Sequence, residues 1–153
     1  MRFFVSAFVA AAIVGNLFGA DQSVPDVESV RAAVRSFHAD PERARGNTAR
    51  IIFQYAEQSR DVQLVMNSKV MSFIKNQKKN FDERSTLLLA FIVGDMEAQW
   101  ARRETKDNSY AGVLQVIATY QQLKKSNPNL RIPEIENFIE MQRRGELKAY
   151  VSG

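Results

Sequence analysis

A run of seven consecutive apolar residues, Leu87–Val93, places the strongest constraint on how this chain folds. A helix that is apolar on all its faces cannot lie at a surface and must be surrounded by other elements. Asn80 and Glu83 precede the run at the spacing of a capping box, which predicts a helix start there. We therefore expect a central helix, whose innermost side chains are Leu88, Phe91 and Ile92.

The rest of the chain after Asp21 also has the periodicity of helices. Apolar residues recur every three or four positions, most clearly from Tyr110 to Leu123, without a sustained two-residue alternation or hairpin turns. Pro133 and Gly145 predict the start and the end of a late helix, with a short tail helix behind it. The sequence predicts an all-α fold of six or seven short helices, either a compact irregular bundle or a small stack of helical hairpins of the solenoid type.

Several boundaries can be placed more closely. Asn47 is a good N-cap and predicts the start of the second helix. Residues 61–66 have apolar side chains at helical spacing, and residues 67–68 indicate a break before a further helix that ends near Asn80. Gly94–Asp95 either turns the chain or lies within a longer helix.

Two short segments resemble parts of a tetratricopeptide repeat. Gly94–Ala98 resembles the turn between the two helices of such a repeat, and Tyr120–Asn129 resembles its closing segment. The two segments are too far apart for one repeat of the usual length, which is about 34 residues. The resemblance therefore implies stacked helical hairpins, and it includes no second copy of the repeat.

The first twenty residues have the order of a secretory signal peptide. Arg2 gives a positive start, residues 3–20 carry no charge, and Asp21 begins a polar sequence. We expect cleavage after Ala20 and export to the periplasm or the extracellular space, with no membrane span in the mature chain. A retained anchor is the alternative, because about 20 apolar residues also span a bilayer. The expected organisation is a signal peptide at 1–20, an N-terminal amphipathic helix and polar connector at 21–46, and a helical domain at 47–153.

The amino-acid composition excludes several kinds of catalytic and metal site. The chain has no Cys and a single His, which excludes disulfides, thiolate nucleophiles and Cys-based zinc sites. That residue, His38, lies in a polar stretch without a partner nearby in the sequence, so we expect a solvated loop histidine. We expect no catalytic centre, no cofactor and no metal, and hence a protein that binds another molecule without transforming it.

The basic residues are the candidate binding groups. Lys and Arg number 21 against 17 for Asp and Glu, and the cations gather near predicted helix C-termini, where they complement the helix dipole. Trp, Tyr and Arg are also the residues that most often carry interface energy. The candidate binding residues are Trp100, Arg102, Arg103, Lys106 and Tyr110. The expected partner is another protein or an anionic envelope surface rather than a nucleic acid, and core packing is the alternative role of Trp100 and Tyr110.

Two other functions stay open. A cavity between helices near Leu88, Phe91 and Ile117 would indicate a carrier of small apolar ligands. An exported, basic, helical chain of this size is also similar to lysozyme-like muramidases, whose acid catalyst is a glutamic acid in apolar surroundings. That resemblance implies a cell-wall glycan hydrolase, with candidate acids at Glu57, Glu83 and Glu97.

Overall fold

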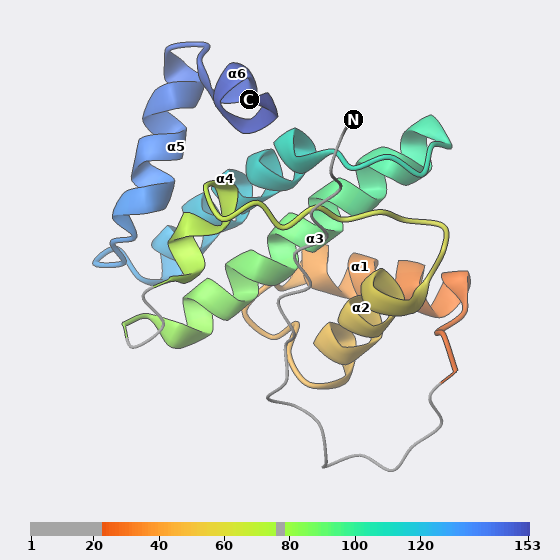
Figure 1. Ribbon diagram of the computed structural model, residues 1–153. Helices are drawn as coiled ribbons and strands as arrows, with labels where there is room; N and C mark the ends of the chain where they lie inside the picture. Colours follow the sequence, from red (N-terminus) through yellow and green to blue (C-terminus); the bar gives the residue numbers. More distant parts are fainter. Residues whose placement is uncertain (1–22, 76–78) are drawn as a thin grey trace.

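The computed structural model of the chain describes residues 23–75 and 79–153, so the expected signal peptide at residues 1–20 lies outside the described residues. The described part is all-helical, as predicted, with six α-helices, one short 3₁₀ helix and no β-strand (Figure 1). No helix within it is both long and apolar enough to cross a membrane. The elements are α1 (Val27–Ala39), α2 (Asn47–Gln58), η1 (Val70–Ile74), α3 (Phe81–Arg102), α4 (Ser109–Ser126), α5 (Pro133–Arg143) and α6 (Leu147–Ser152).

The helices that follow one another in the chain are also neighbours in space. α3 and α4 run antiparallel through the middle of the molecule and share its most extensive helix contact (Figure 1). α1 and α2 pack together on one side, with α2 against α3, and α5 and α6 lie on the opposite side against α4. One continuous apolar core therefore has the α3–α4 pair at its centre.

The central helix expected from the apolar run is α3. Phe91 and Ile92 are buried in it, and Leu88 is half-buried and packed against the core. α3 is 22 residues long and continues through Gly94–Ala98, so the turn implied there by the tetratricopeptide resemblance is wrong. α3 and the 18-residue α4 are also longer than the short helices expected.

Two glycines allow α3 and α4 to approach closely. A Cβ atom at Gly112 would lie 2.7 Å from the ring of Phe91 and 2.8 Å from the Phe91 carbonyl oxygen. A Cβ atom at Gly94 would lie 2.7 Å from the carbonyl oxygen of Ala111. Real Cβ atoms do not approach backbone so closely, and this contact explains why glycine occurs inside two helices despite its low helix propensity.

The later helices have clear ends, and the start and the end predicted for α5 are confirmed. Asn108 is the N-cap of α4, and its side chain accepts a hydrogen bond from the N–H of Ala111. Pro133 lies in the first turn of α5. Gly145 follows the end of α5 with a φ of 75°, a left-handed conformation that glycine adopts without strain.

Helices begin at the two other positions predicted, at Asn47 and directly after Asn80, but neither asparagine forms the expected capping hydrogen bond. Asn47 is the first residue of α2 rather than its cap, and its side chain accepts a hydrogen bond from Arg50. Asn80 has a φ of 55° and forms no capping hydrogen bond. Its side chain instead donates to the carbonyl oxygen of Arg131, a partner that is distant in sequence.

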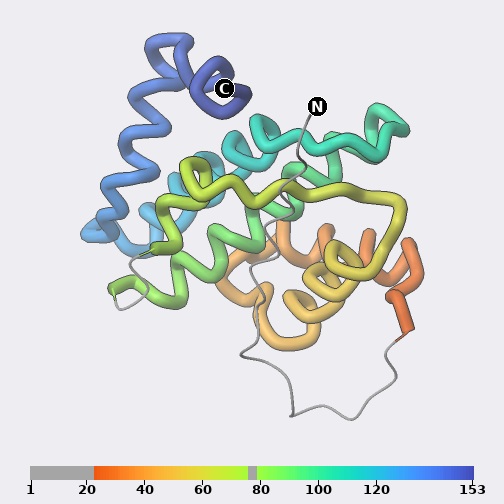
Figure 2. The backbone as a smooth tube through the Cα atoms, in the orientation of Figure 1, coloured from red at the N-terminus to blue at the C-terminus, as the bar shows by residue number. Residues whose placement is uncertain are grey.

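Residues 59–69 form an irregular strap rather than the helix expected at 61–66 (Figure 2). The side chain of Gln99 accepts from the N–H of Gln63 at 3.0 Å and donates to its carbonyl oxygen at 2.7 Å. Asp107 accepts from the N–H of Val65 at 2.7 Å. These side chains take the backbone groups that a helix would use, so the strap is stable without helical hydrogen bonds. The helix expected after residue 68 is reduced to η1.

Candidate functional site

The five predicted binding residues lie around the turn between α3 and α4, at one end of the central helix pair (Figure 1). Trp100 and Arg102 are in the last turn of α3, Arg103 is its C-cap, Lys106 is in the connecting loop and Tyr110 is in the first turn of α4. The side chains of the three cations are exposed to solvent. This turn is therefore the basic surface that we consider as a site.

The two aromatic candidates contribute to packing. Trp100 is half-buried, with its ring 6.0 Å from the ring of Tyr55 and the guanidinium of Arg31 at 5.0 Å from its centroid. These contacts join α3 to α2 and α1. Tyr110 is also half-buried and packs against the core. The aromatic rings thus support the turn, and the cations are the groups available to a partner.

The three cations at the turn form no ion pair within the described part of the chain, although the exposed Glu104 lies between Arg103 and Lys106 in the sequence. Neither Arg102, Arg103 nor Lys106 forms an ion pair with any of the described residues. Some cations elsewhere on the surface are paired, such as Arg45, which lies 2.8 Å from Asp82, whereas others such as Lys125 form no ion pair with the described residues. The dipole of α3 offsets part of the positive charge, since a helix C-terminus carries about half a negative charge. Residues 102–107 hold these three cations and two carboxylates, Glu104 and Asp107, so the turn keeps one net positive charge before the dipole is counted.

His38 is not the unpartnered loop residue that the sequence indicated. It lies in the last turn of α1, and its Nε2 is 2.9 Å from Oε2 of Glu97 on α3. The exposed fractions of the His38 and Glu97 side chains are 40% and 41%. The pair therefore joins two helices at the surface.

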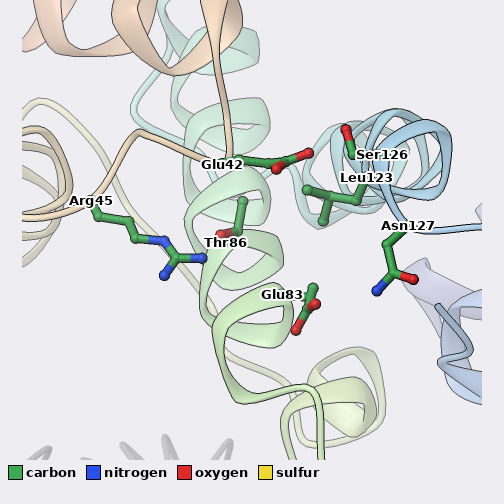
Figure 3. A pocket seen from close by; sticks show the side chains of 7 residues that line it. All are labelled: Glu42, Arg45, Glu83, Thr86, Leu123, Ser126 and Asn127. Carbon is green, nitrogen blue, oxygen red and sulfur yellow. The ribbon is translucent and has the colours of Figure 1, made fainter. Parts of the chain in front are cut away.

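A small polar hollow lies where the α1–α2 connector meets the start of α3 and the end of α4 (Figure 3). Its volume is about 150 Å³. Arg45 is already paired with Asp82, and the hydroxyl of Thr86 donates to the Asp82 carbonyl oxygen. Glu42 and Glu83 are the two carboxylates that this hollow offers to solvent. The full lining is Glu42, Arg45, Glu83, Thr86, Leu123, Ser126 and Asn127.

A second, more open hollow of about 400 Å³ lies between α4 and α5, and its lining includes Tyr120 and Glu136. The Tyr120 hydroxyl donates to Glu136 at 2.9 Å and accepts from the N–H of Ile132 at 3.2 Å. Neither hollow is lined by Leu88, Phe91 or Ile117, the residues expected around a small apolar ligand. Neither hollow therefore supports a carrier function.

The glutamates proposed for glycan hydrolysis are open to solvent. Glu57 is exposed on α2, Glu83 is half-buried beside the polar hollow, and Glu97 is bonded to His38. A carboxylic acid that donates a proton to a glycosidic oxygen needs apolar surroundings that favour its neutral form. None of the three positions provides such surroundings.

Asp95 is a buried acid that is not among the candidate site residues predicted from the sequence. Its side chain is 0% exposed, and its Oδ1 accepts from Nε2 of Gln99 and from the N–H of Asn108, both at 2.8 Å. Its Oδ2 is buried without a hydrogen-bond partner in the described structure. A signal was present, because Asp95 follows Phe91 by four residues and so lies on the same, core-facing side of α3.

The environment of Asp95 favours its neutral form. The pKa of Asp95 is raised to about 7, chiefly by burial, and repulsion from the carboxylate of Asp107 acts in the same direction. The hydrogen bonds from Gln99 and Asn108 act in the opposite direction. An acid with this pKa could transfer protons at neutral pH, but Asp95 has no exposed surface for a substrate. Its ionisation therefore acts on the protein itself.

We predict a pH-dependent stability that Asp95→Asn removes. The unfolded carboxyl loses its proton near pH 4, whereas the folded one keeps it until about pH 7. The free energy of unfolding contributed by Asp95 therefore falls as pH rises from 4 to 7, by up to a few kcal/mol, and is constant above that range. Urea unfolding at several pH values should show Asp95→Asn gaining stability relative to the wild type across this window. The exposed control Asp82→Asn should show no such gain.

Comparisons with protein-family models, with curated proteins and with solved structures gave no match. The basic turn between α3 and α4 and the buried acid beside it are therefore the features from which a function can be inferred.

Proposed function

We propose that this chain is an exported, non-enzymatic binding protein that holds an anionic surface of the cell envelope at the turn between α3 and α4. The supporting observation is that Arg102, Arg103 and Lys106 are exposed there without an ion-pair partner among the described residues. Export is supported by the charge pattern of residues 1–20. Cations near an anionic membrane surface contribute about 1 kcal/mol of attraction each.

The turn is held on a rigid base, which favours binding. Trp100 is fixed by Tyr55 and Arg31, and the close contact at Gly94 and Gly112 holds α3 against α4. Groups that are already held in place lose less conformational entropy when they bind. The cations are therefore presented in a defined arrangement and not on a long flexible segment.

The other functions have less support. An acidic protein would be attracted by the same cations and is the main alternative partner. A carrier of small apolar ligands lacks a hollow at the expected residues. A glycan hydrolase would have to use the polar hollow at Glu42 and Glu83, whose volume of about 150 Å³ is small for a polymeric substrate.

Reversal of the three cations should abolish most of the binding. We expect the exported chain with Arg102, Arg103 and Lys106 replaced by Glu to bind vesicles that contain an anionic phospholipid about a hundredfold more weakly than the wild type. The loss of about 3 kcal/mol corresponds to three cations at about 1 kcal/mol each, and repulsion adds to it. Co-sedimentation with the vesicles measures the change, and circular dichroism should show the same helix content in both proteins.

The control is a second triple reversal with the same change in net charge. Arg43, Lys125 and Lys148 are exposed cations outside the α3–α4 turn, and their replacement by Glu should reduce binding far less. Equal losses in the two variants would mean that net charge alone drives binding. That result would contradict a defined site at the turn.

A further inference from the structure

Two acidic side chains take part in the hydrogen-bond cluster that holds the strap to α3 and to the α3–α4 loop. Asp95 is buried on α3, and Asp107 belongs to the loop, where it is half-buried. The N–H of Asn108, the residue after Asp107, donates to Asp95 Oδ1 at 2.8 Å, which ties this end of the loop to Asp95. Gln99 connects Asp95 to the strap, because its Nε2 donates both to Asp95 Oδ1 at 2.8 Å and to the Gln63 carbonyl oxygen at 2.7 Å.

Asp107 carries the second attachment. Its Oδ1 accepts from the N–H of Val65 on the strap at 2.7 Å, and its Oδ2 accepts from the hydroxyl and the N–H of Ser109 at 2.8 and 3.2 Å. Asp95 is on a rigid helix, whereas Asp107 is on a loop. Any repulsion between the two carboxylates therefore displaces Asp107 and weakens its bond to Val65.

We propose that Asp95 and Asp107 form a proton-operated latch, which fastens the strap and the α3–α4 loop to the core while Asp95 is protonated and releases them when Asp95 ionises. On ionisation the O–H bond of the Asp95 carboxyl breaks and its proton passes to solvent water. The new carboxylate then repels Asp107, and its buried Oδ2 needs water to solvate it. Water enters as the strap separates from the loop.

The surrounding groups do not supply a competing charge. From α3 the neutral amide of Gln99 faces Asp95, and from the loop the backbone N–H of Asn108 and the carboxylate of Asp107 face it. The other charged side chains of the two segments are all exposed: Arg60, Asp61 and Lys69 on the strap, and Arg103, Glu104 and Lys106 on the loop. Asp107 is thus the charged group that responds to the ionisation of Asp95.

The latch deepens the proposed function, because Arg103 and Lys106 lie on the same loop as Asp107. If the binding proposal holds, opening of the loop changes how these cations are presented, so vesicle binding should change as Asp95 ionises. The latch itself does not depend on any partner. Its test below needs only the chain, so a failure of the binding proposal and a failure of the latch are separate results.

Hydrogen exchange at two strap amides tests the latch. The N–H groups of Gln63 and Val65 should be protected at pH 6 and, after correction for intrinsic exchange, about tenfold less protected at pH 8. That factor follows from linkage over the one pH unit between pH 6 and a pKa of about 7, above which the contribution no longer changes. In Asp95→Asn the protection should not depend on pH. The matched control is the amide of Met71, which donates to the Asn67 carbonyl oxygen away from both acids and should not change.

A carboxyl ¹³C titration provides the second measurement and needs no variant at Asp95. The Asp95 carboxyl of the wild type should titrate near pH 7, and Asp107→Asn should move that midpoint to lower pH because it removes the repelling charge. Asn at 107 keeps an acceptor oxygen for Val65, so the strap remains attached. An Asp95 midpoint near pH 4, or equal strap protection at pH 6 and pH 8 in the wild type, would overturn the latch.

Discussion

Phe91→Ala should lower the free energy of unfolding by about 3–5 kcal/mol, as large aromatic truncations in a packed core do. Phe91 is 0% exposed in the middle of α3, and its ring and its carbonyl oxygen face Gly112 of α4. The ring therefore lies at the closest contact between the two central helices. Urea unfolding followed by circular dichroism measures the loss.

Phe81→Ala is the matched control for Phe91→Ala. Phe81 is the first residue of the same helix but is 58% exposed, so its truncation should change stability by about 0.5 kcal/mol or less. If Phe91→Ala left the urea midpoint unchanged, α3 would not be the central helix, and the position of the α3–α4 turn would lose its basis.

Arg84→Met should destabilise the protein by about 3 kcal/mol, because it leaves buried polar groups without their partner. Arg84 is buried in α3, where its Nε donates to the Lys79 carbonyl oxygen at 3.0 Å and its Nη1 donates to the Phe73 carbonyl oxygen. Its Nη2 lies 3.6 Å from Glu134 of α5. One side chain thus links η1, α3 and α5, and methionine keeps much of its volume without these bonds.

Two further variants show whether the charge pair is responsible. Arg45→Met removes the exposed partner of Asp82 and should cost less than about 1 kcal/mol, the usual value of a surface ion pair. Adding Glu134→Leu to Arg84→Met should recover part of the loss, since it removes the carboxylate left unpaired. Equal urea midpoints for Arg84→Met and Arg45→Met would contradict the role assigned to Arg84.

The helices could be predicted because their signals are local. Phe91 and Ile92 belong to a continuous apolar run, and Asn108 caps α4 through an amide only three residues away. Such patterns place helices without knowledge of the tertiary fold. The same locality explains why a turn and a longer helix both stayed open at Gly94, because a glycine that admits a neighbouring helix looks in the sequence like a glycine that ends one.

The strap and the buried acid could not be predicted in this way. The contact between Gln63 and Gln99 spans 36 residues, that between Val65 and Asp107 spans 42, and that between His38 and Glu97 spans 59. Helical spacing at residues 61–66 is a weak preference, and bonds from distant side chains override it.

The basic turn between α3 and α4 could be predicted in part from the sequence. Clusters of cations such as Arg102 and Arg103 are visible in a sequence, and their proximity to a helix end could be predicted. The absence of ion pairs at Arg102, Arg103 and Lys106 among the described residues depends on where distant carboxylates lie in the fold. The packing of Trp100 against Tyr55 and Arg31 likewise depends on three helices meeting.

The central claim is that the basic turn holds an anionic surface, and the binding of the chain without residues 1–20 to vesicles tests it most directly. Binding should be measured with and without an anionic phospholipid in the vesicles, at low and at high salt. The Debye length falls from about 30 Å at 0.01 M salt to about 3 Å at 1 M, so exposed charges lose most of their attraction. We predict binding to the anionic vesicles alone, and its loss at high salt. Equal binding to neutral vesicles, or binding that salt does not change, would contradict the claim.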